Sequence, residues 1–245
     1  MGGRSLSGPV TAADGTPAWL RITAANQRGS KVWEGTSLAE QCLSSGIPRP
    51  PLLAAHEWDN DEQAVQALLW GRLTAPLLSH TPDLAAPVQP DPQWWQALRF
   101  ALQRLRTITS PPGREVITQR YVDRVSRFLP QLRHSELDVT IRHWETSHGD
   151  LHWGNLTIAP LNIIDWEGWG PAPAGTDEAT LHAYALPHPK VAARVRDAFA
   201  DVLDTPEGKL AHVTVADQII QASQRDETHA RLAPYVSEFA KKLIL

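Results

Sequence analysis

The chain has 245 residues, of which 42% are hydrophobic, and it carries a formal net charge of −4. This composition is sufficient for a buried core, and the slight negative charge offers no broad basic surface for nucleic acid or anionic membrane. The single cysteine, Cys42, excludes an internal disulfide, and no run of about 18 apolar residues is present for a membrane span. Because no apolar signal core stands at the amino terminus, we expect a cytoplasmic protein.

The first residues predict two strands joined by a turn. Residues 2–9 are rich in glycine and serine and stand ahead of a strand that ends near Ala12. Asp14 and Gly15 predict the turn, and residues 18–23 predict the returning strand. Backbone N–H groups of a glycine-containing loop between strands can bind nucleotide phosphates, whereas a flexible terminus is the alternative interpretation of this composition.

A helix and two further strands are predicted next. Residues 32–43 have apolar side chains at roughly helical spacing, and Gly46 favours a helix end. The prolines of residues 47–51 exclude helix and predict a rigid extended linker. Residues 52–56 and 64–70 then predict two strands around a polar turn, so this part of the chain should form a small sheet with one helix.

Beyond residue 73 the pattern becomes mainly helical. A proline-rich connector over residues 82–92 precedes a helix predicted for residues 94–108 and a second one for residues 116–129. Two or three more helices are predicted after residue 190, with breaks near residues 204–206 and Pro234. The acidic side chains there that could contact a cationic substrate, or else be surface charges, are Asp226, Glu227 and Glu238.

Polar side chains gather between residues 147 and 167. Two short apolar runs on either side of Pro160 and Leu161 predict a hairpin, which would place Leu156 opposite Asp165 and Asn155 within a residue of it. Asp150 lies five residues before Asn155, in a loop whose glycines allow a sharp bend. The sequence therefore predicts two acids and an amide at one end of a hairpin.

Such a set suits phosphoryl transfer. One acid, Asp150, can orient a hydroxyl, while Asn155 and Asp165 can together hold Mg²⁺, which binds protein through one or two carboxylates plus the nucleotide phosphates. The order Asp, four residues, Asn, hairpin, Asp is that of the catalytic loop and metal-binding segment of eukaryotic-type kinases.

The sequence His148-Gly-Asp150-Leu-His152-Trp-Gly-Asn155, followed by Ile-Ile-Asp165-Trp-Glu, closely resembles the aminoglycoside phosphotransferase and choline kinase family. The resemblance implies an α+β, protein-kinase-like fold with two lobes. Residues 1–73 would form a nucleotide-binding lobe with a small antiparallel sheet, and residues 74–245 a larger helical lobe with the catalytic loop and substrate site. Because the chain begins almost on the presumed glycine-rich loop, the first strand of the sheet is expected to be missing or vestigial.

The resemblance also implies roles for residues outside the motif. Arg21 stands in the strand where family members carry a phosphate-contacting Lys or Arg, and Glu34, in preference to Glu40, is expected to pair with it. Asp177 should brace the catalytic segment from the start of a helix. For Arg21 and both glutamates, solvated charges are the alternative. The hinge that meets the adenine is expected near residues 69–73.

Two histidines accompany the motif. We expect His148 to fix the loop by hydrogen bonding the backbone and His152 to face the cleft. With His143 they could instead form a transition-metal site of a hydrolase, which would need further ligands at matching spacing. Three nearby tryptophans could stack on a ligand or pack in the core: Trp153, Trp166 and Trp169.

The function expected is transfer of the ATP γ-phosphoryl group to a hydroxyl of a small molecule, such as an aminoglycoside-like antibiotic, a sugar or an amino alcohol. ATP and Mg²⁺ are the implied cofactors, although ATP and GTP are not distinguished, and the oligomeric state stays open. The carboxyl-terminal residues 241–245 provide no acid to receive an amine, which argues against an aminoglycoside. A non-catalytic kinase-like binding protein is the alternative, motivated by the short start and by Arg21.

Overall fold

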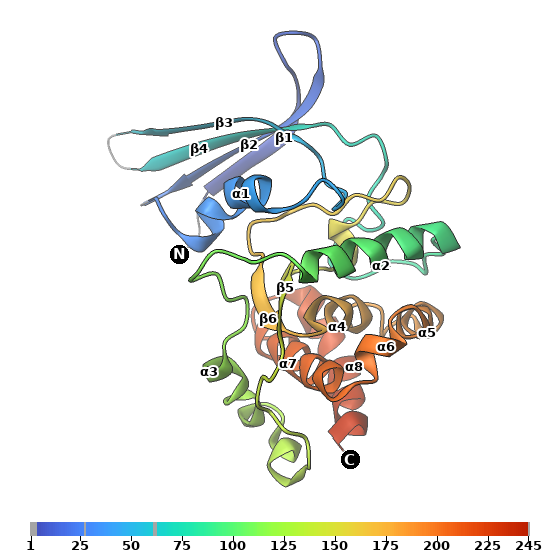
Figure 1. Cartoon of the computed structure of the whole chain (residues 1–245). Helices are drawn as coiled ribbons and strands as arrows, with labels where there is room; N and C mark the ends of the chain where they lie inside the picture. The colour runs from blue at the N-terminus through green and yellow to red at the C-terminus, as the bar shows by residue number, and fades with distance from the viewer. Residues whose placement is uncertain (1–3, 27, 61–62, 245) are drawn as a thin grey trace.

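Four antiparallel strands form the sheet of the amino-terminal lobe in the computed structural model, which describes residues 4–26, 28–60 and 63–244. The strands are β1 (Arg4–Thr11), β2 (Pro17–Ala25), β3 (Leu52–Asp59) and β4 (Ala64–Gly71). Their order across the sheet is β1-β2-β4-β3, so that β1 and β3 are its edges (Figure 1). Both predicted pairs of strands are confirmed.

Strand β1 begins earlier than the sequence predicted. Ser7 lies opposite Arg21 and Gly8 lies opposite Leu20, so the small-residue segment pairs with β2 instead of standing ahead of the strand. Ladder pairing satisfies backbone groups that a loop of such small side chains would leave to solvent. Gly2 and Gly3 lie outside the described residues, and the expected loss of a first strand stays a prediction.

Helix α1 (Lys31–Cys42) packs on one face of this sheet. It begins after Ser30, whose side chain accepts a hydrogen bond from the Trp33 N–H over 3.1 Å. The Trp33 indole donates to Glu57 of β3 over 2.7 Å, and Gln66 of β4 donates to the Trp33 carbonyl over 3.1 Å. These contacts hold α1 between the sheet and the rest of the molecule (Figure 1).

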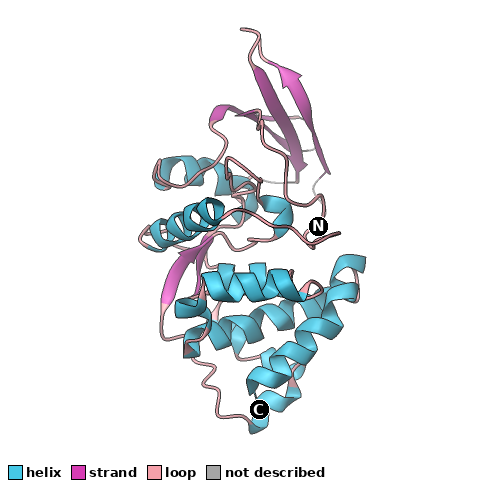
Figure 2. Cartoon of the chain, turned by 90° about the vertical axis from the view of Figure 1, so that its right-hand side faces the viewer, coloured by secondary structure: helices cyan, strands magenta, loops and turns pink. Residues whose placement is uncertain are grey.

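Residues 72–91 run from β4 to the helical lobe without a helix or strand. Their backbone contacts residues 147–167, the predicted catalytic segment, instead: Leu78 donates to the Leu156 carbonyl over 2.8 Å, and Trp153 donates to the Pro82 carbonyl over 3.2 Å. The predicted proline-rich connector is therefore the neighbour of the catalytic segment. Figure 2 shows the four-stranded sheet at the top of the molecule and most of the helices below it.

The helical lobe contains most of the remaining elements. Its helices are α2 (Pro92–Arg106), α3 (Gln119–Val122), α4 (Thr176–Ala183), α5 (Pro189–Ala198), α6 (Ala200–Leu203), α7 (Pro206–Ala222) and α8 (Glu227–Ile244). Short 3₁₀ helices are η1 (Val125–Arg127), η2 (Pro130–His134) and η3 (Trp153–Asn155). Strands β5 (Trp144–Ser147) and β6 (Gly170–Pro173) pair in antiparallel fashion on either side of the catalytic segment.

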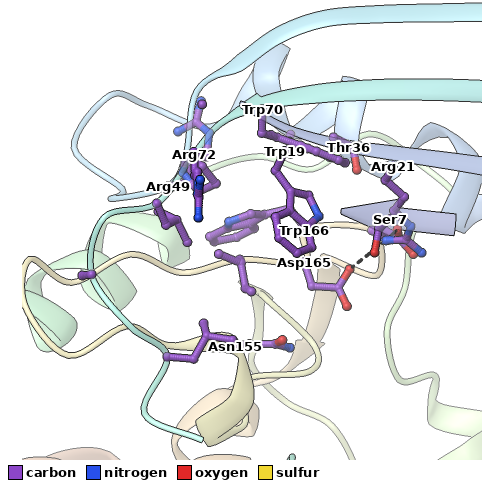
Figure 3. Close-up of a pocket in the computed structure, with 18 of the residues that line it drawn as sticks. Ser7, Trp19, Arg21, Thr36, Arg49, Trp70, Arg72, Asn155, Asp165 and Trp166 are labelled. Atoms are coloured by element: carbon purple, nitrogen blue, oxygen red, sulfur yellow. Dashed lines mark ion pairs between the residues drawn. The ribbon is translucent and has the colours of Figure 1, made fainter. Parts of the chain in front are cut away.

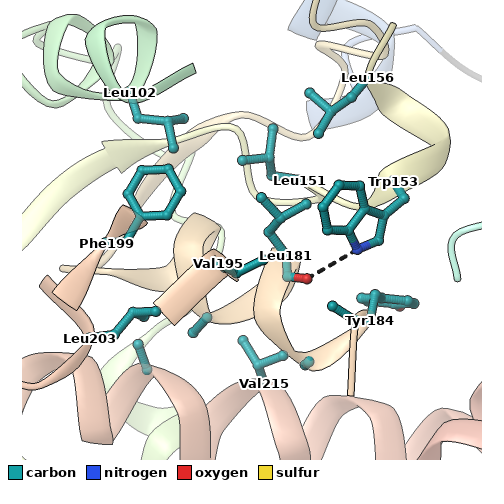
Figure 4. Close-up of a cluster of buried hydrophobic side chains, with 14 of the residues drawn as sticks. Leu102, Leu151, Trp153, Leu156, Leu181, Tyr184, Val195, Phe199, Leu203 and Val215 are labelled. Carbon is teal, nitrogen blue, oxygen red and sulfur yellow. Dashed lines mark hydrogen bonds between the residues drawn. The ribbon is translucent and has the colours of Figure 1, made fainter. Parts of the chain in front are cut away.

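Helix α4 is the centre of this lobe, because every one of its residues is buried. The Leu181 carbonyl of α4 accepts a hydrogen bond from the Trp153 indole over 3.2 Å, which joins the core to the catalytic segment (Figure 4). Leu151 and Leu156 of that segment are fully buried in the same cluster. The catalytic segment is thus held by the core beneath it.

None of the described helices combines the length and apolar character needed to cross a membrane.

Two helix predictions are wrong. A single helix over residues 116–129 does not form: Thr118 caps the short α3, which ends at Val122, and the separate 3₁₀ helix η1 begins at Val125. Phe128, near the end of the predicted helix, is 40% exposed. Pro234 does not break the chain but lies within α8, where the buried residues Leu232 and Val236 outweigh the cost of about 3 kcal/mol for an interior proline.

Two histidines are buried against each other in the helical lobe. His182 of α4 and His212 of α7 place their ring nitrogens 3.1 Å apart. Burial is the main cause that lowers the pKa of His182 to about 3 and that of His212 to about 4, and Arg196 lowers both further. Both rings are therefore neutral in the folded protein, whereas the unfolded chain binds these protons near pH 6.5.

We expect the free energy of unfolding to decrease as the pH falls below about 6.5, because the unfolded chain then takes up protons that the folded chain excludes. The two rings should together contribute a slope of roughly 2 kcal/mol per pH unit near pH 5. Urea unfolding at about pH 7.5 and pH 5 measures this loss, and His182→Asn should lose less than the parent protein. An equal loss in both proteins would contradict a buried neutral pair.

Candidate active site

Hydrogen bonds from backbone N–H groups fix the loop that carries Asp150. Asp177, in the first turn of α4, accepts hydrogen bonds from the N–H groups of His148 and Gly149 over 2.7 and 2.9 Å. The His148 ring lies 2.9 Å from the Ile164 carbonyl, so it links the loop to the segment before Asp165. These contacts match the supporting roles predicted for Asp177 and His148.

The two acids of this loop region, Asp177 and Asp150, have pKa values shifted in opposite directions. Burial, and then the neighbouring Glu178, raise the pKa of Asp177 to about 7, although its two N–H partners oppose this. Burial also disfavours the charged form of Asp150, but contact with His152 and the charges of His148 and His229 outweigh it and lower the pKa of Asp150. Asp150, with a side chain 56% exposed, is therefore the ionised and accessible acid of the loop.

The hairpin that follows has a different register from the one predicted. Leu156 pairs with Ile163, not with Asp165, and the Ile164 N–H donates to the Asn155 carbonyl over 3.0 Å. The loop is longer than Pro160 and Leu161 because the Thr157 hydroxyl donates to the Pro160 carbonyl and accepts from the Asn162 N–H, both over 2.7 Å. Asp165 still emerges one residue beyond the partner of Asn155, so the two side chains remain neighbours.

Asn155 and Asp165 line the same cavity, whose volume is about 690 Å³ (Figure 3). Asn155 donates its amide N–H to the Asp150 carbonyl over 2.9 Å, and its Oδ1 makes no hydrogen bond with the described residues. Asp165 is 44% exposed at its side chain and has a positive φ of 68°. An oriented amide oxygen beside an accessible carboxylate fits a hard cation such as Mg²⁺.

Arg21 reaches this cavity from β2, but its partner is not the one predicted. Its guanidinium pairs with Glu167 and lies 3.7 Å from Asp165. Glu34 makes no ion pair with Arg21 among the described residues and does not line the cavity. Glu40, the acid not preferred, does line it and pairs with Arg49 over 3.2 Å. The expected pairing of Arg21 with Glu34 is therefore wrong.

Glu34 misses the cavity because α1 is held in one rotation against residues 167–169. The Trp169 indole donates to the Gly35 carbonyl over 2.9 Å, and a Cβ at Gly35 would lie 1.9 Å from the Glu167 carbonyl oxygen. The buried Arg114 guanidinium joins both sides, since it donates to the Lys31 and Glu167 carbonyls, each over 2.9 Å. Burial and the nearby Asp165 raise the pKa of Glu167.

The cavity roof contains residues 70–73 of the expected hinge, but its tryptophan pair was not predicted. Trp19 of β2 lies opposite Trp70 of β4, and both line the cavity with Gly71, Arg72 and Leu73, where the chain leaves the sheet (Figure 3). Trp19 is 41% exposed although it is large and aromatic. The sequence signal for this roof was two tryptophans on strands expected to pair, one of them two residues before Arg21.

The tryptophans of the motif have different roles. Trp153 and Trp169 are fully buried, so core packing is confirmed for them and stacking on a ligand is wrong. Trp166 is 5% exposed and lines the cavity, with its ring against His148 at 4.6 Å between centroids.

The structure also bears on the alternative metal site. The His143 ring lies 2.7 Å from the Glu207 carboxylate, and no group of three His, Cys, Asp or Glu suited to a metal ion occurs within residues 4–26, 28–60 and 63–244. The hydrolase interpretation gains no ligand set there.

Comparisons with known proteins bear on the fold. Neither a protein family nor a curated protein sequence matches the chain. Among solved structures, it is similar to the apo form of a thermostable mutant of the aminoglycoside phosphotransferase APH(4)-Ia, with a TM-score of 0.66 and 12% identity over 100% of this chain and 92% of that one. The predicted α+β, kinase-like fold is thus confirmed.

Proposed function

We propose that the protein is an ATP-dependent phosphotransferase that acts on a hydroxyl group of a small molecule. The observation that carries this proposal is the cavity in which Asn155, Asp165 and Arg21 converge beneath an aromatic roof, next to the loop of Asp150. Magnesium and ATP, when bound, would supply the phosphoryl group and neutralise part of its charge.

Each residue then has one task. Asp150 orients the attacking hydroxyl and accepts its proton, because it is ionised and accessible. Asn155 and Asp165 hold the cation, and Arg21 steadies the phosphates from above while Glu167 holds its guanidinium. Catalysis in such a site consists mainly of positioning and charge neutralisation, which the fixed backbone of the loop supports.

The proposal is tested by ATP binding, measured by calorimetry with and without Mg²⁺, and by ADP release with hydroxylated acceptors. We expect binding that depends on Mg²⁺ and ADP release that depends on an acceptor. If ATP bound but no acceptor ever released ADP, a kinase-like binding protein would be the better account. If no nucleotide bound, the proposal would fail.

Trp19 should support the nucleotide base. We expect Trp19→Leu to weaken ATP binding about tenfold, because stacking of a base on an aromatic ring contributes roughly 1–3 kcal/mol. Trp58 of β3 is the matched control: it is 37% exposed and does not line the cavity, so Trp58→Leu should leave ATP affinity unchanged. Equal effects of the two changes, measured by calorimetry, would show that Trp19 has no special contact with the base.

A further inference from the structure

The side of Asp150 that the acceptor must approach differs from the nucleotide cavity. Asp150 does not line that cavity, although Asn155 and Asp165 do. His152 lies 3.5 Å from the Asp150 carboxylate, and its ring contacts that of Tyr184, the residue after α4, at 5.7 Å between centroids. Outside the nucleotide cavity, the His152 ring is thus next to the Asp150 carboxylate, and the Tyr184 ring is next to that of His152.

A hydrogen-bonded chain extends from these rings to the first turn of α8. The Tyr184 hydroxyl lies 2.8 Å from the His229 Nε2 atom, and the His229 Nδ1 atom lies 2.6 Å from the Asp226 carboxylate just before the helix. Because an ionised carboxylate only accepts, Nδ1 carries a proton and donates to Asp226. In the neutral ring Nε2 then accepts from Tyr184. Tyr184 therefore donates to His229 and His229 donates to Asp226, and these two hydrogen bonds fix the orientation of the His229 ring.

A second pair stands beside this chain. Arg231 of α8 donates to Asp83 of the connector over 2.9 Å, and in its hydrogen bonds with the described residues it uses only the Nη2 atom. Asp83 is 8% exposed, and its other oxygen, Oδ1, is buried without a partner in the described part of the chain. The Arg231 side chain is 57% exposed, so its Nε and Nη1 donors are open to a ligand.

The carboxylates near Asp150 have hydrogen-bond partners. Asp226 accepts from His229 and Asp83 accepts from Arg231, so Asp150 is the carboxylate left to an acceptor there. Glu227, which begins α8, lies close enough to act on Arg231 as well. Glu238, once a candidate for a cationic substrate, pairs with Lys242 at 2.7 Å on the exposed side of α8. A polycation would find no set of free carboxylates among these side chains.

We propose that His152 and the start of α8, with His229 and Arg231, form the acceptor site, and that its acceptor is a neutral polyhydroxylated ring, such as a sugar or cyclitol; Tyr184 positions the His229 ring. This inference rests on the proposed function. The His152 and His229 side chains are 13% and 22% exposed, so these rings can contact the C–H faces of such a molecule, while the open Arg231 donors suit its hydroxyl oxygens. One hydroxyl would then reach Asp150.

The test uses the full chain with Mg²⁺ and a non-hydrolysable ATP analogue, titrated by calorimetry with four probes. These are myo-inositol (neutral), kanamycin (polycationic), choline (a quaternary ammonium) and gluconate (anionic). We expect myo-inositol to bind most tightly. Tighter binding of kanamycin, choline or gluconate, or no binding of myo-inositol while the nucleotide analogue binds, would overturn the inference and leave the proposed function standing.

Variants locate the site. His229→Asn and Arg231→Gln should each weaken myo-inositol binding at least tenfold without changing the affinity for the ATP analogue. His143→Asn is the matched control, since His143 also contacts a carboxylate, Glu207, but is 71% exposed and takes no part in the chain of contacts. If both variants bound myo-inositol as the parent does, the first turn of α8 would not be the acceptor site. If the parent protein did not bind the ATP analogue, the proposed phosphotransferase function itself would be refuted.

Discussion

Replacing Asp165 by asparagine is expected to reduce phosphotransfer by on the order of 10²–10³-fold while leaving the protein folded. The change removes the carboxylate charge that would face the cation but keeps the shape of the side chain. Asp165 has a positive φ of 68°, which asparagine tolerates better than alanine does. Stability should therefore stay close to that of the parent, and the loss can be assigned to chemistry.

The measurement combines ADP release with thermal unfolding. Glu238→Gln is the control, because it removes an acid from an exposed ion pair of α8 that does not line the cavity. Its activity should be unchanged. If Asp165→Asn kept full phosphotransfer, the assignment of Asp165 to the cation would be wrong, and if it unfolded, the charge would have a structural role that its contacts do not show.

Gly35→Ala is expected to destabilise the protein by about 2–4 kcal/mol and to abolish most phosphotransfer. Alanine in an exposed helix normally stabilises relative to glycine by about 1 kcal/mol. Here the added Cβ would lie 1.9 Å from the Glu167 carbonyl oxygen, so α1 must move away. That movement breaks the hydrogen bond from Trp169 to the Gly35 carbonyl and shifts the segment that carries Asp165.

Urea unfolding and ADP release measure both effects. Gly168→Ala is the matched control: it lies in the same segment, but a Cβ there meets no atom within 4 Å, and its φ is not positive. We expect little change in stability or activity for it. An unchanged unfolding midpoint for Gly35→Ala would mean that the contact between α1 and Glu167 is loose.

Local spacing accounts for what could be predicted of the site. The loop from His148 to Asn155 and the acid Asp165 lie within one short segment, so few conformations are open to the chain between them. The error in hairpin register moved Asp165 by two positions relative to Leu156, yet Asn155 and Asp165 still line one cavity. Because these residues are close in sequence, an error in the predicted turn did not change which of them lie together.

Contacts between distant elements account for what was missed. The partner of Arg21 depends on the rotation of α1, and that rotation is set where Gly35 meets the Glu167 carbonyl, more than a hundred residues apart in the chain. The helical spacing of apolar residues within 32–43 placed Glu34 correctly on a helix but could not say which way its side chain faces. Likewise Tyr184 and His229 meet only because α4 and α8 pack together.

The sequence by itself determined the strands of the small sheet, the catalytic segment and the kinds of side chain that a phosphotransferase needs, because these depend on periodicity and short-range spacing. Only the tertiary structure decided which charged side chains pair, which tryptophans line the cavity and which side chains surround Asp150. Those outcomes depend on how close two elements can approach, and that distance is set by side-chain volume and buried hydrogen bonds across the whole fold.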